Sequence, residues 1–217
     1  MTISGPLLFD LDGTLIDSLD DLTAAVNHMR SAFSHPPLAA DTVRTMVGRG
    51  ARNLIRQALP EPGIASQEKA LGLFLDYNRQ HIADHSRPYP GITELLETLT
   101  DCGCRLAVIS NKNEDLSRTI LEALGIAGHF TLVCGGDTFS EMKPSPLPLL
   151  RVIERLGTAP GQGSMIGDSI NDIQAGKRAG IATVGCQWGY GAAHDLEQAD
   201  FMISSPNEIL ALMAENV

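Results

Sequence analysis

Two aspartates stand close together near the start of the chain, in the string Phe9-Asp10-Leu11-Asp12-Gly13-Thr14-Leu15. The apolar residues 6–9 lead into them and predict a short buried strand, and open α/β sheets bind their ligands where strands end. Gly13 permits a sharp turn, so the carboxylates of Asp10 and Asp12 can converge on one small volume. Grouped oxygen ligands suit Mg²⁺, and one carboxylate can also attack as a nucleophile, as in enzymes that form an aspartyl-phosphate. The string therefore favours a reactive site over an acidic turn that only solvates the end of a strand.

A second acidic segment, Gly167-Asp168-Ser169-Ile170-Asn171-Asp172, follows another apolar run, at 164–166. We expect Asp168, at the end of that strand, to complete the ligand shell of the metal. Asp172, four residues later, would lie about one helical turn along the same face. By itself the segment is equally typical of a helix that begins with capping acids. In combination with Asp10 and Asp12 it favours a shared site.

Groups that could bind a phosphate lie in two other segments. Lys143 stands in the string Met142-Lys143-Pro144-Ser145-Pro146, which two prolines stiffen, just before a predicted helix. A lone lysine is usually solvated, but its position after the third predicted strand makes Lys143 a candidate phosphate ligand. Ser110 and Asn111 follow the apolar run 106–109, where a hydroxyl and a backbone N–H can bind phosphate oxygens. Ser110 could instead cap the next helix, so both roles stay open for it.

The elements that must position these residues follow from the apolar pattern. Continuous apolar runs, which are typical of parallel strands covered on both faces, occur at 6–9, 106–109, 131–133, 164–166, 181–184 and 201–203. Apolar stripes at helical spacing lie between or after these runs, at 92–99, 116–124, 149–156 and 206–213. This alternation predicts an α/β fold with a doubly wound parallel sheet.

Residues 18–87 follow a different pattern, because three helical stripes (19–33, 43–59 and 71–82) occur there without a strand-like run. Proline-rich breakers separate the stripes. We therefore expect a helical domain over 18–87, inserted after the first strand, and an α/β core made of 1–17 and 88–217. A helical module that is tethered at the end of a strand is well placed to act as a lid.

Composition excludes several classes of function. The 217 residues carry a formal net charge of −10 and a pI near 4.9, which argues against binding nucleic acid through a basic patch or binding a membrane surface by charge. We expect no membrane span and no signal peptide. The four cysteines form no C-x-x-C pair and suit reduced thiols, so we expect a cytoplasmic protein.

Four strings in this order resemble the motifs of the haloacid dehalogenase superfamily: Asp10-Leu11-Asp12-Gly13-Thr14, Ser110-Asn111-Lys112, Lys143-Pro144, and Gly167 to Asp172. Segment 18–87 is similar to the helical cap of that superfamily, so the resemblance covers essentially the whole chain. Within the superfamily the chain is most similar to phosphoglycolate phosphatases, on the strings Val47-Gly48-Arg49-Gly50, Gly135-Gly136-Asp137 and Trp188-Gly189-Tyr190-Gly191.

The resemblance implies a role for the leading residues. Asp10 would be the nucleophile, and Asp12 would protonate the leaving oxygen and then activate water. Mg²⁺ would be held by the Asp10 carboxylate, the backbone carbonyl of Asp12 and the Asp168 carboxylate.

The remaining motif residues would support them. Ser110, Asn111 and Lys143 would hold the phosphoryl oxygens and stabilise charge in the transition state. Asp172 would orient Lys143 or a water on the metal. Thr14 and Ser169, which belong to the same motifs, would lie behind the residues that contact the substrate.

The implied substrate is a small phosphorylated metabolite, with 2-phosphoglycolate the first candidate and a sugar phosphate or amino-sugar phosphate the alternative. Arg49, between Gly48 and Gly50, is the candidate that would recognise a substrate carboxylate, although it could equally be an exposed arginine. The protein would act as a monomer or a homodimer.

Four rival functions fit the residues less well. Dehalogenases of the superfamily lack an acid at the position of Asp12, and phosphonate-cleaving relatives use a cap lysine, for which this segment offers only Lys69. Receiver domains are much shorter and have no helical insertion. A phosphate-metabolite-binding protein on the same fold is the non-enzyme alternative, but every motif position holds a residue that is competent for the chemistry.

Overall fold

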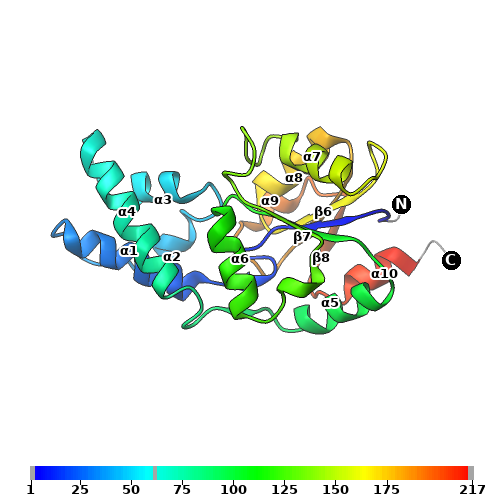
Figure 1. Ribbon diagram of the computed structural model, residues 1–217, viewed down its shortest axis with the longest axis horizontal. Coiled ribbons are helices and arrows are strands. Elements are labelled where there is room, and N and C mark those ends of the chain that lie inside the picture. Colours follow the sequence, from blue (N-terminus) through cyan, green and yellow to red (C-terminus); the bar gives the residue numbers. More distant parts are fainter. Residues whose placement is uncertain (1–2, 61–62, 215–217) are drawn as a thin grey trace.

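The computed structural model describes residues 3–60 and 63–214. Its centre is a sheet of six parallel strands in the order β5-β4-β1-β6-β7-β8 (Figure 1). The strands are β1 (Leu7–Phe9), β4 (Leu106–Ile109), β5 (Leu132–Cys134), β6 (Ser164–Gly167), β7 (Ala182–Cys186) and β8 (Phe201–Ile203). All six apolar runs form strands, so the prediction of a doubly wound parallel α/β sheet is confirmed.

Continuous apolar strands form here because both faces of the sheet are covered. In β1 the side chains of Leu7 and Phe9 join the core on one face, whereas Leu8 joins the core on the other. The first core also receives α5 (Ile92–Asp101), α6 (Glu114–Ala123) and α10 (Glu208–Ala214). The second receives α7 (Leu147–Arg155) and α8 (Ile170–Ala179). Figure 1 shows these two helical layers on opposite sides of the strands.

Three short elements complete this part of the chain: the 3₁₀ helix η1 (Ala127–His129), α9 (Ala193–Leu196) and α10. The apolar stripe at 206–213 led us to expect a helix from Pro206, but α10 begins two residues later, at Glu208. The Glu208 carboxylate accepts hydrogen bonds from the backbone of Ser204 and Ser205, which holds residues 204–207 in a turn before the helix.

In the sequence, four helices follow β1 and precede the other strands of the main sheet: α1 (Leu19–Ala32), α2 (Ala40–Arg44), α3 (Ala51–Ala58) and α4 (Ile64–Gln80). They pack on one another around a hydrophobic cluster of their own, and they stand to one side of the sheet in Figure 1. The stripe at 43–59, which we expected as one helical pattern, is two helices separated by a loop at 45–50. Gly48 and Gly50 adopt φ values of +100° and +78°, which a right-handed helix does not allow.

Two strands tie this helical insertion to the sheet. β2 (Ile16–Asp17) pairs in antiparallel fashion with β3 (Arg87–Pro88), so the chain enters and leaves the insertion side by side. Next to this ladder the buried carboxylate of Asp21 accepts backbone hydrogen bonds from His85 and Ser86. The expected boundaries of the helical domain, near residues 17 and 88, fall at this ladder. That the insertion and the α/β core behave as separate domains stays a prediction. No helix within the described ranges is long and apolar enough to span a membrane.

Candidate active site

The predicted site residues meet at the carboxyl ends of three adjacent strands. In the register of the sheet, Phe9 of β1 pairs with Val108 of β4 on one side and with Ile166 of β6 on the other. Asp10, Ser110 and Asp168 come one or two residues after these positions, and all three side chains are buried. Parallel pairing therefore brings together residues that are about 160 positions apart in sequence.

Three aspartates and one lysine form the centre of this site. Asp10, Asp168 and Asp172 each direct a carboxylate oxygen to a common point, with these oxygens within 4.8 Å of one another. Lys143 Nζ lies 2.8 Å from Oδ1 of Asp10 and 2.7 Å from Oδ1 of Asp172, and its side chain is 1% exposed. The structure thus places Lys143 beside the proposed nucleophile and between two carboxylates.

The electrostatics of this group are compatible with a further cation. Burial, together with repulsion from Asp172, raises the pKa of Asp10 to about 8, although Lys143 acts in the opposite direction. Burial and Asp172 also raise the pKa of Asp168 to about 6. Burial lowers the pKa of Lys143, but attraction to Asp10 and Asp172 outweighs it and the pKa rises, so the lysine is charged. Three carboxylates beside one lysine leave an excess of negative charge, and carboxylate oxygens are suitable ligands for a hard divalent cation. The group can therefore hold a metal ion.

Asp168 is oriented by hydrogen bonds on both of its oxygens. The hydroxyl of Thr14 donates to Oδ1 over 2.9 Å, and the backbone N–H groups of Tyr190 and Gly191 donate to Oδ2 over 2.6 and 3.2 Å. The close approach of backbone 189–191 to Asp168 requires glycine at 189, because a β-carbon there would lie 2.4 Å from Oδ2 of Asp168. Thr14 therefore contacts Asp168, and its supporting role in the reaction stays a prediction. Residues 189–191 also hold Asp168, which the sequence analysis did not predict.

Asp172 has two roles at once. Its Oδ2 accepts hydrogen bonds from the backbone and hydroxyl of Ser169 at the start of α8, which is a capping box. Its Oδ1 contacts Lys143. The helix-capping interpretation of this segment is therefore confirmed, and the role of Asp172 in the active site stays a prediction, which its contact with Lys143 supports.

Asp12 lies outside the group of three carboxylates. Its Oδ1 accepts a hydrogen bond from the hydroxyl of Ser18 over 2.5 Å and lies 3.3 Å from Nζ of Lys112. Tyr190 reaches the same place, since its hydroxyl accepts a hydrogen bond from the backbone N–H of Ser18. Sequence reasoning missed Lys112 and Ser18. Lys112 had a signal, because it is the only cation in the string that begins at Ser110, whereas Ser18 had none.

Ser110 and Asn111 lie beside Asp10 but differ in what they contact. The Ser110 hydroxyl accepts a hydrogen bond from the backbone of Lys112 and does not cap α6. The Asn111 side-chain amide donates to the backbone carbonyls of Lys143 and of Gly48, over 2.8 and 2.9 Å. The side-chain amide of Asn111 is thus engaged by two backbone carbonyls. If Asn111 contacts the phosphate, its backbone N–H must make the contact, and that stays a prediction.

The helical insertion contacts the core at Gly48. The Gly48 carbonyl accepts a second hydrogen bond, over 3.2 Å, from the side chain of Asn171 on α8. Arg49, the next residue, is exposed and borders an outer cavity that also contains Asp10, Asp12 and Asp168. The structure therefore places Arg49 at the rim of the site.

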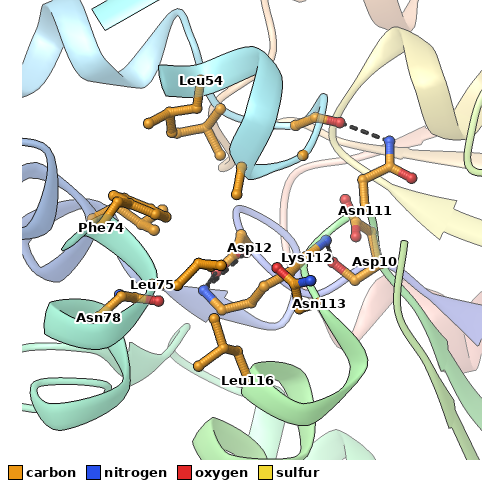
Figure 2. A pocket seen from close by; sticks show the side chains of 16 residues that line it. Asp10, Asp12, Leu54, Phe74, Leu75, Asn78, Asn111, Lys112, Asn113 and Leu116 are labelled. Atoms are coloured by element: carbon orange, nitrogen blue, oxygen red, sulfur yellow. Dashed lines mark hydrogen bonds and ion pairs between the residues drawn. The ribbon is translucent and has the colours of Figure 1, made fainter. Parts of the chain in front are cut away.

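An inner pocket lies between the reactive residues and the helical insertion (Figure 2). Asp10 and Asp12 line one side of it, together with Lys112. Leu54 of α3 and Phe74 of α4 line the opposite side. A substrate in this pocket would contact both parts of the chain.

Comparison with known proteins agrees with this geometry. A family model described as haloacid dehalogenase-like hydrolase matches residues 7–186. A phosphoglycolate phosphatase of Chromobacterium violaceum is 40% identical over 210 residues, covering 94% of each chain, and one of Aquifex aeolicus is 38% identical, covering 97% of each. The crystal structure of a predicted phosphoglycolate phosphatase from Haemophilus somnus superposes with a TM-score of 0.92 at 32% identity, over 98% of this chain and 99% of that one. The chain therefore belongs to the haloacid dehalogenase-like hydrolase family, as an enzyme that hydrolyses phosphoric monoesters.

Proposed function

We propose that the protein hydrolyses 2-phosphoglycolate to glycolate and phosphate, with Mg²⁺ and through an aspartyl-phosphate on Asp10. The observation that carries the proposal is the buried contact of Asp10 with Lys143 at the end of β1, beside two further carboxylates. The names of the two relatives at about 40% identity support the choice of substrate.

In the proposed first step, an Asp10 oxygen forms a bond to phosphorus as the bond from phosphorus to the ester oxygen breaks. Asp12 gives its proton to that ester oxygen, and glycolate leaves. Lys143 and Ser110 hold the phosphoryl oxygens, since both side chains lie next to Asp10 and Lys143 is charged. In the second step Asp12 takes a proton from water, the water oxygen attacks phosphorus, and the Asp10 carboxylate is released with phosphate.

The residues that would hold Mg²⁺ are Asp10, Asp168 and the backbone carbonyl of Asp12. When bound, the ion would neutralise the buried negative charge, so that a phosphate dianion can approach and Asp10 stays ionised. The raised pKa of Asp10, about 8, supports this need for a cation.

The helical insertion at 18–87 acts in this proposal as a cap domain that covers the substrate. Its support is the contact of the Gly48 carbonyl with Asn111 and Asn171 of the core. Arg49, beside that contact, is proposed to attract the substrate carboxylate toward the site from the rim. The four cysteines are free thiols, in keeping with the expected cytoplasmic location.

Phosphate release from a panel of phosphorylated metabolites, with Mg²⁺ and with EDTA, tests the proposal. We expect kcat/KM for 2-phosphoglycolate to exceed that for sugar phosphates by about a hundredfold, or about 2.7 kcal/mol. Asp10→Asn should abolish turnover, and turnover in that variant would remove the covalent mechanism. A comparable preference for a sugar phosphate would keep the mechanism and replace the substrate.

A further inference from the structure

Two polar side chains of the inner pocket have no role in the mechanism above. Lys112 follows the site serine of β4, and Asn78 lies on α4 of the helical insertion. The Lys112 side chain is 7% exposed and Asn78 is 2% exposed, so neither is a solvated surface group. In Figure 2 the Lys112 side chain reaches across the pocket toward Asp12, and Asn78 lies on the wall beyond it.

The position of Lys112 relates it to the leaving group of the substrate. Its Nζ lies 3.3 and 3.4 Å from the two carboxylate oxygens of Asp12. Asp12 is the residue that protonates the ester oxygen in the proposed function, on which this inference rests. The part of the substrate that is bonded to the ester oxygen must therefore lie next to Lys112. In 2-phosphoglycolate that part is one methylene group and a carboxylate.

Asn78 provides a second, independent observation. Its Oδ1 is buried and has no hydrogen-bond partner among the described residues. Because Oδ1 does not hold the amide to any described residue, the amide group can present its two N–H donors to a carboxylate that enters the pocket. Oδ1 itself is an acceptor, so the carboxylate does not satisfy it, and the contact is made by the N–H groups alone.

The rest of the pocket wall strengthens such an ionic contact. Leu54, Phe74 and Leu116 line the pocket around the two polar groups. Apolar walls exclude water, and charge attraction is stronger where water is excluded.

We propose that Lys112 and Asn78 together form the subsite for the substrate carboxylate and make the protein selective for short phosphorylated carboxylic acids. The ammonium of Lys112 pairs with the carboxylate while remaining beside Asp12, and the Asn78 amide donates a hydrogen bond to it from the helical insertion. Because the two groups come from different parts of the chain, the acid that fits the pocket also holds those parts together.

The test compares 2-phosphoglycolate with carbamoylmethyl phosphate. This analogue keeps the phosphate and nearly the same shape, but an uncharged amide replaces the carboxylate. The variants are Lys112→Met and Asn78→Leu, which remove the polar groups but keep the bulk. Lys69→Met and Gln80→Leu are matched controls, because both residues are exposed on the same helix as Asn78. We expect the acid-to-amide ratio of kcat/KM to fall at least tenfold in Lys112→Met and about fivefold in Asn78→Leu, and to stay unchanged in the controls.

A change in the ratio separates recognition from other effects. Loss of Lys112 also disturbs Asp12, so an equal fall for both substrates would mean that Lys112 only positions Asp12, and the proposal would be overturned. Asn78→Asp supplies a further arm that keeps the size of the side chain, and its negative charge should weaken turnover of the acid more than that of the amide. Turnover of the amide analogue by each variant shows that it is folded.

Failure of this subsite can be told apart from failure of the proposed function. If the wild-type protein prefers 2-phosphoglycolate and the variants keep its acid-to-amide ratio, the subsite alone is wrong. If the wild-type protein hydrolyses other phosphomonoesters and leaves 2-phosphoglycolate untouched, the proposed substrate is wrong and the subsite with it.

Discussion

Lys143 Nζ lies 2.8 Å from Oδ1 of Asp10, and both side chains are buried. Asp172 holds the lysine from the other side over 2.7 Å, and a capping box fixes Asp172 in turn. The position of this charge is therefore set by the start of a helix, and little reorganisation is needed when a phosphate arrives. Preorganised charge of this kind is a large source of rate enhancement.

Removal of that charge should be costly for turnover. We expect Lys143→Met to lower kcat by about a thousandfold, because one preorganised group commonly contributes about 3–4 kcal/mol to the transition state. Steady-state phosphate release measures the effect, and Lys177→Met, at an exposed position on α8, is the control. A loss smaller than tenfold would mean that Lys143 has a structural role only.

The stability of the metal-free protein should depend on pH in an unusual direction. The pKa values of Asp10 and Asp168 are raised to about 8 and 6 from an ordinary value of 3.8. A carboxyl with a raised pKa in the folded state binds its proton more tightly there, so its contribution is complete below pH 3.8 and is lost as pH rises toward 8. Urea unfolding in EDTA should therefore give a free energy that falls between about pH 4 and pH 8.

Added Mg²⁺ should reverse this trend, because the ion favours the ionised carboxylates. The Asp10→Asn variant should lose most of the pH dependence in EDTA, since the most strongly shifted group is then absent. Unfolding curves with the same slope against pH in the variant and in the wild-type protein would contradict the assignment to Asp10.

The contact at Gly48 should affect substrate binding more than chemistry. Its carbonyl accepts hydrogen bonds from Asn111 and Asn171, which join the helical insertion to the core. Each such bond contributes about 1 kcal/mol, so Asn171→Ala should raise KM about fivefold with little change in kcat. Lys177→Ala on the same helix should leave both constants unchanged. A fall in kcat at constant KM would indicate instead that Asn171 acts in the chemical step.

The carboxylate of Asp21 should contribute to the stability of the junction between the insertion and the sheet. Burial raises its pKa, but hydrogen bonds from Ser86 and His85 outweigh burial, so the pKa lies below its usual value. The contribution of a carboxyl with a lowered pKa is present above the ordinary value of 3.8 and is lost as pH falls. We expect Asp21→Asn to lower the free energy of unfolding by about 2 kcal/mol at pH 7. Asp20→Asn, its exposed neighbour, should change it by less than about 0.5 kcal/mol, and equal effects would contradict the role of the junction.

The parts of the fold that were predicted correctly depend on local patterns. The run that ends at Phe9 is apolar on both faces of the strand, and that pattern is sufficient to predict a buried parallel strand. Asp10 and Asp168 follow such runs directly, so their convergence at one edge of the sheet follows from the direction of the strands. The stripe at 43–59 misled because a helical spacing of apolar residues survives across a loop, and only the positive φ values at Gly48 and Gly50 interrupt the helix.

The sequence by itself determined the order of the six strands of the main sheet, the principal helices between them and the residue types at the strand ends, because these are local properties. Tertiary structure decided which groups meet. Lys112 contacts Asp12 across 100 positions, and Asn78 lines the same pocket from α4, whose apolar stripe does not indicate which residues of the core the helix will face. The Tyr190 N–H that orients Asp168 is a backbone group, which every residue except proline has, so no residue type marks it. Contacts of this kind depend on the packing of the helical insertion and of the loop after β7 against the sheet, and they exist only once those parts are in place.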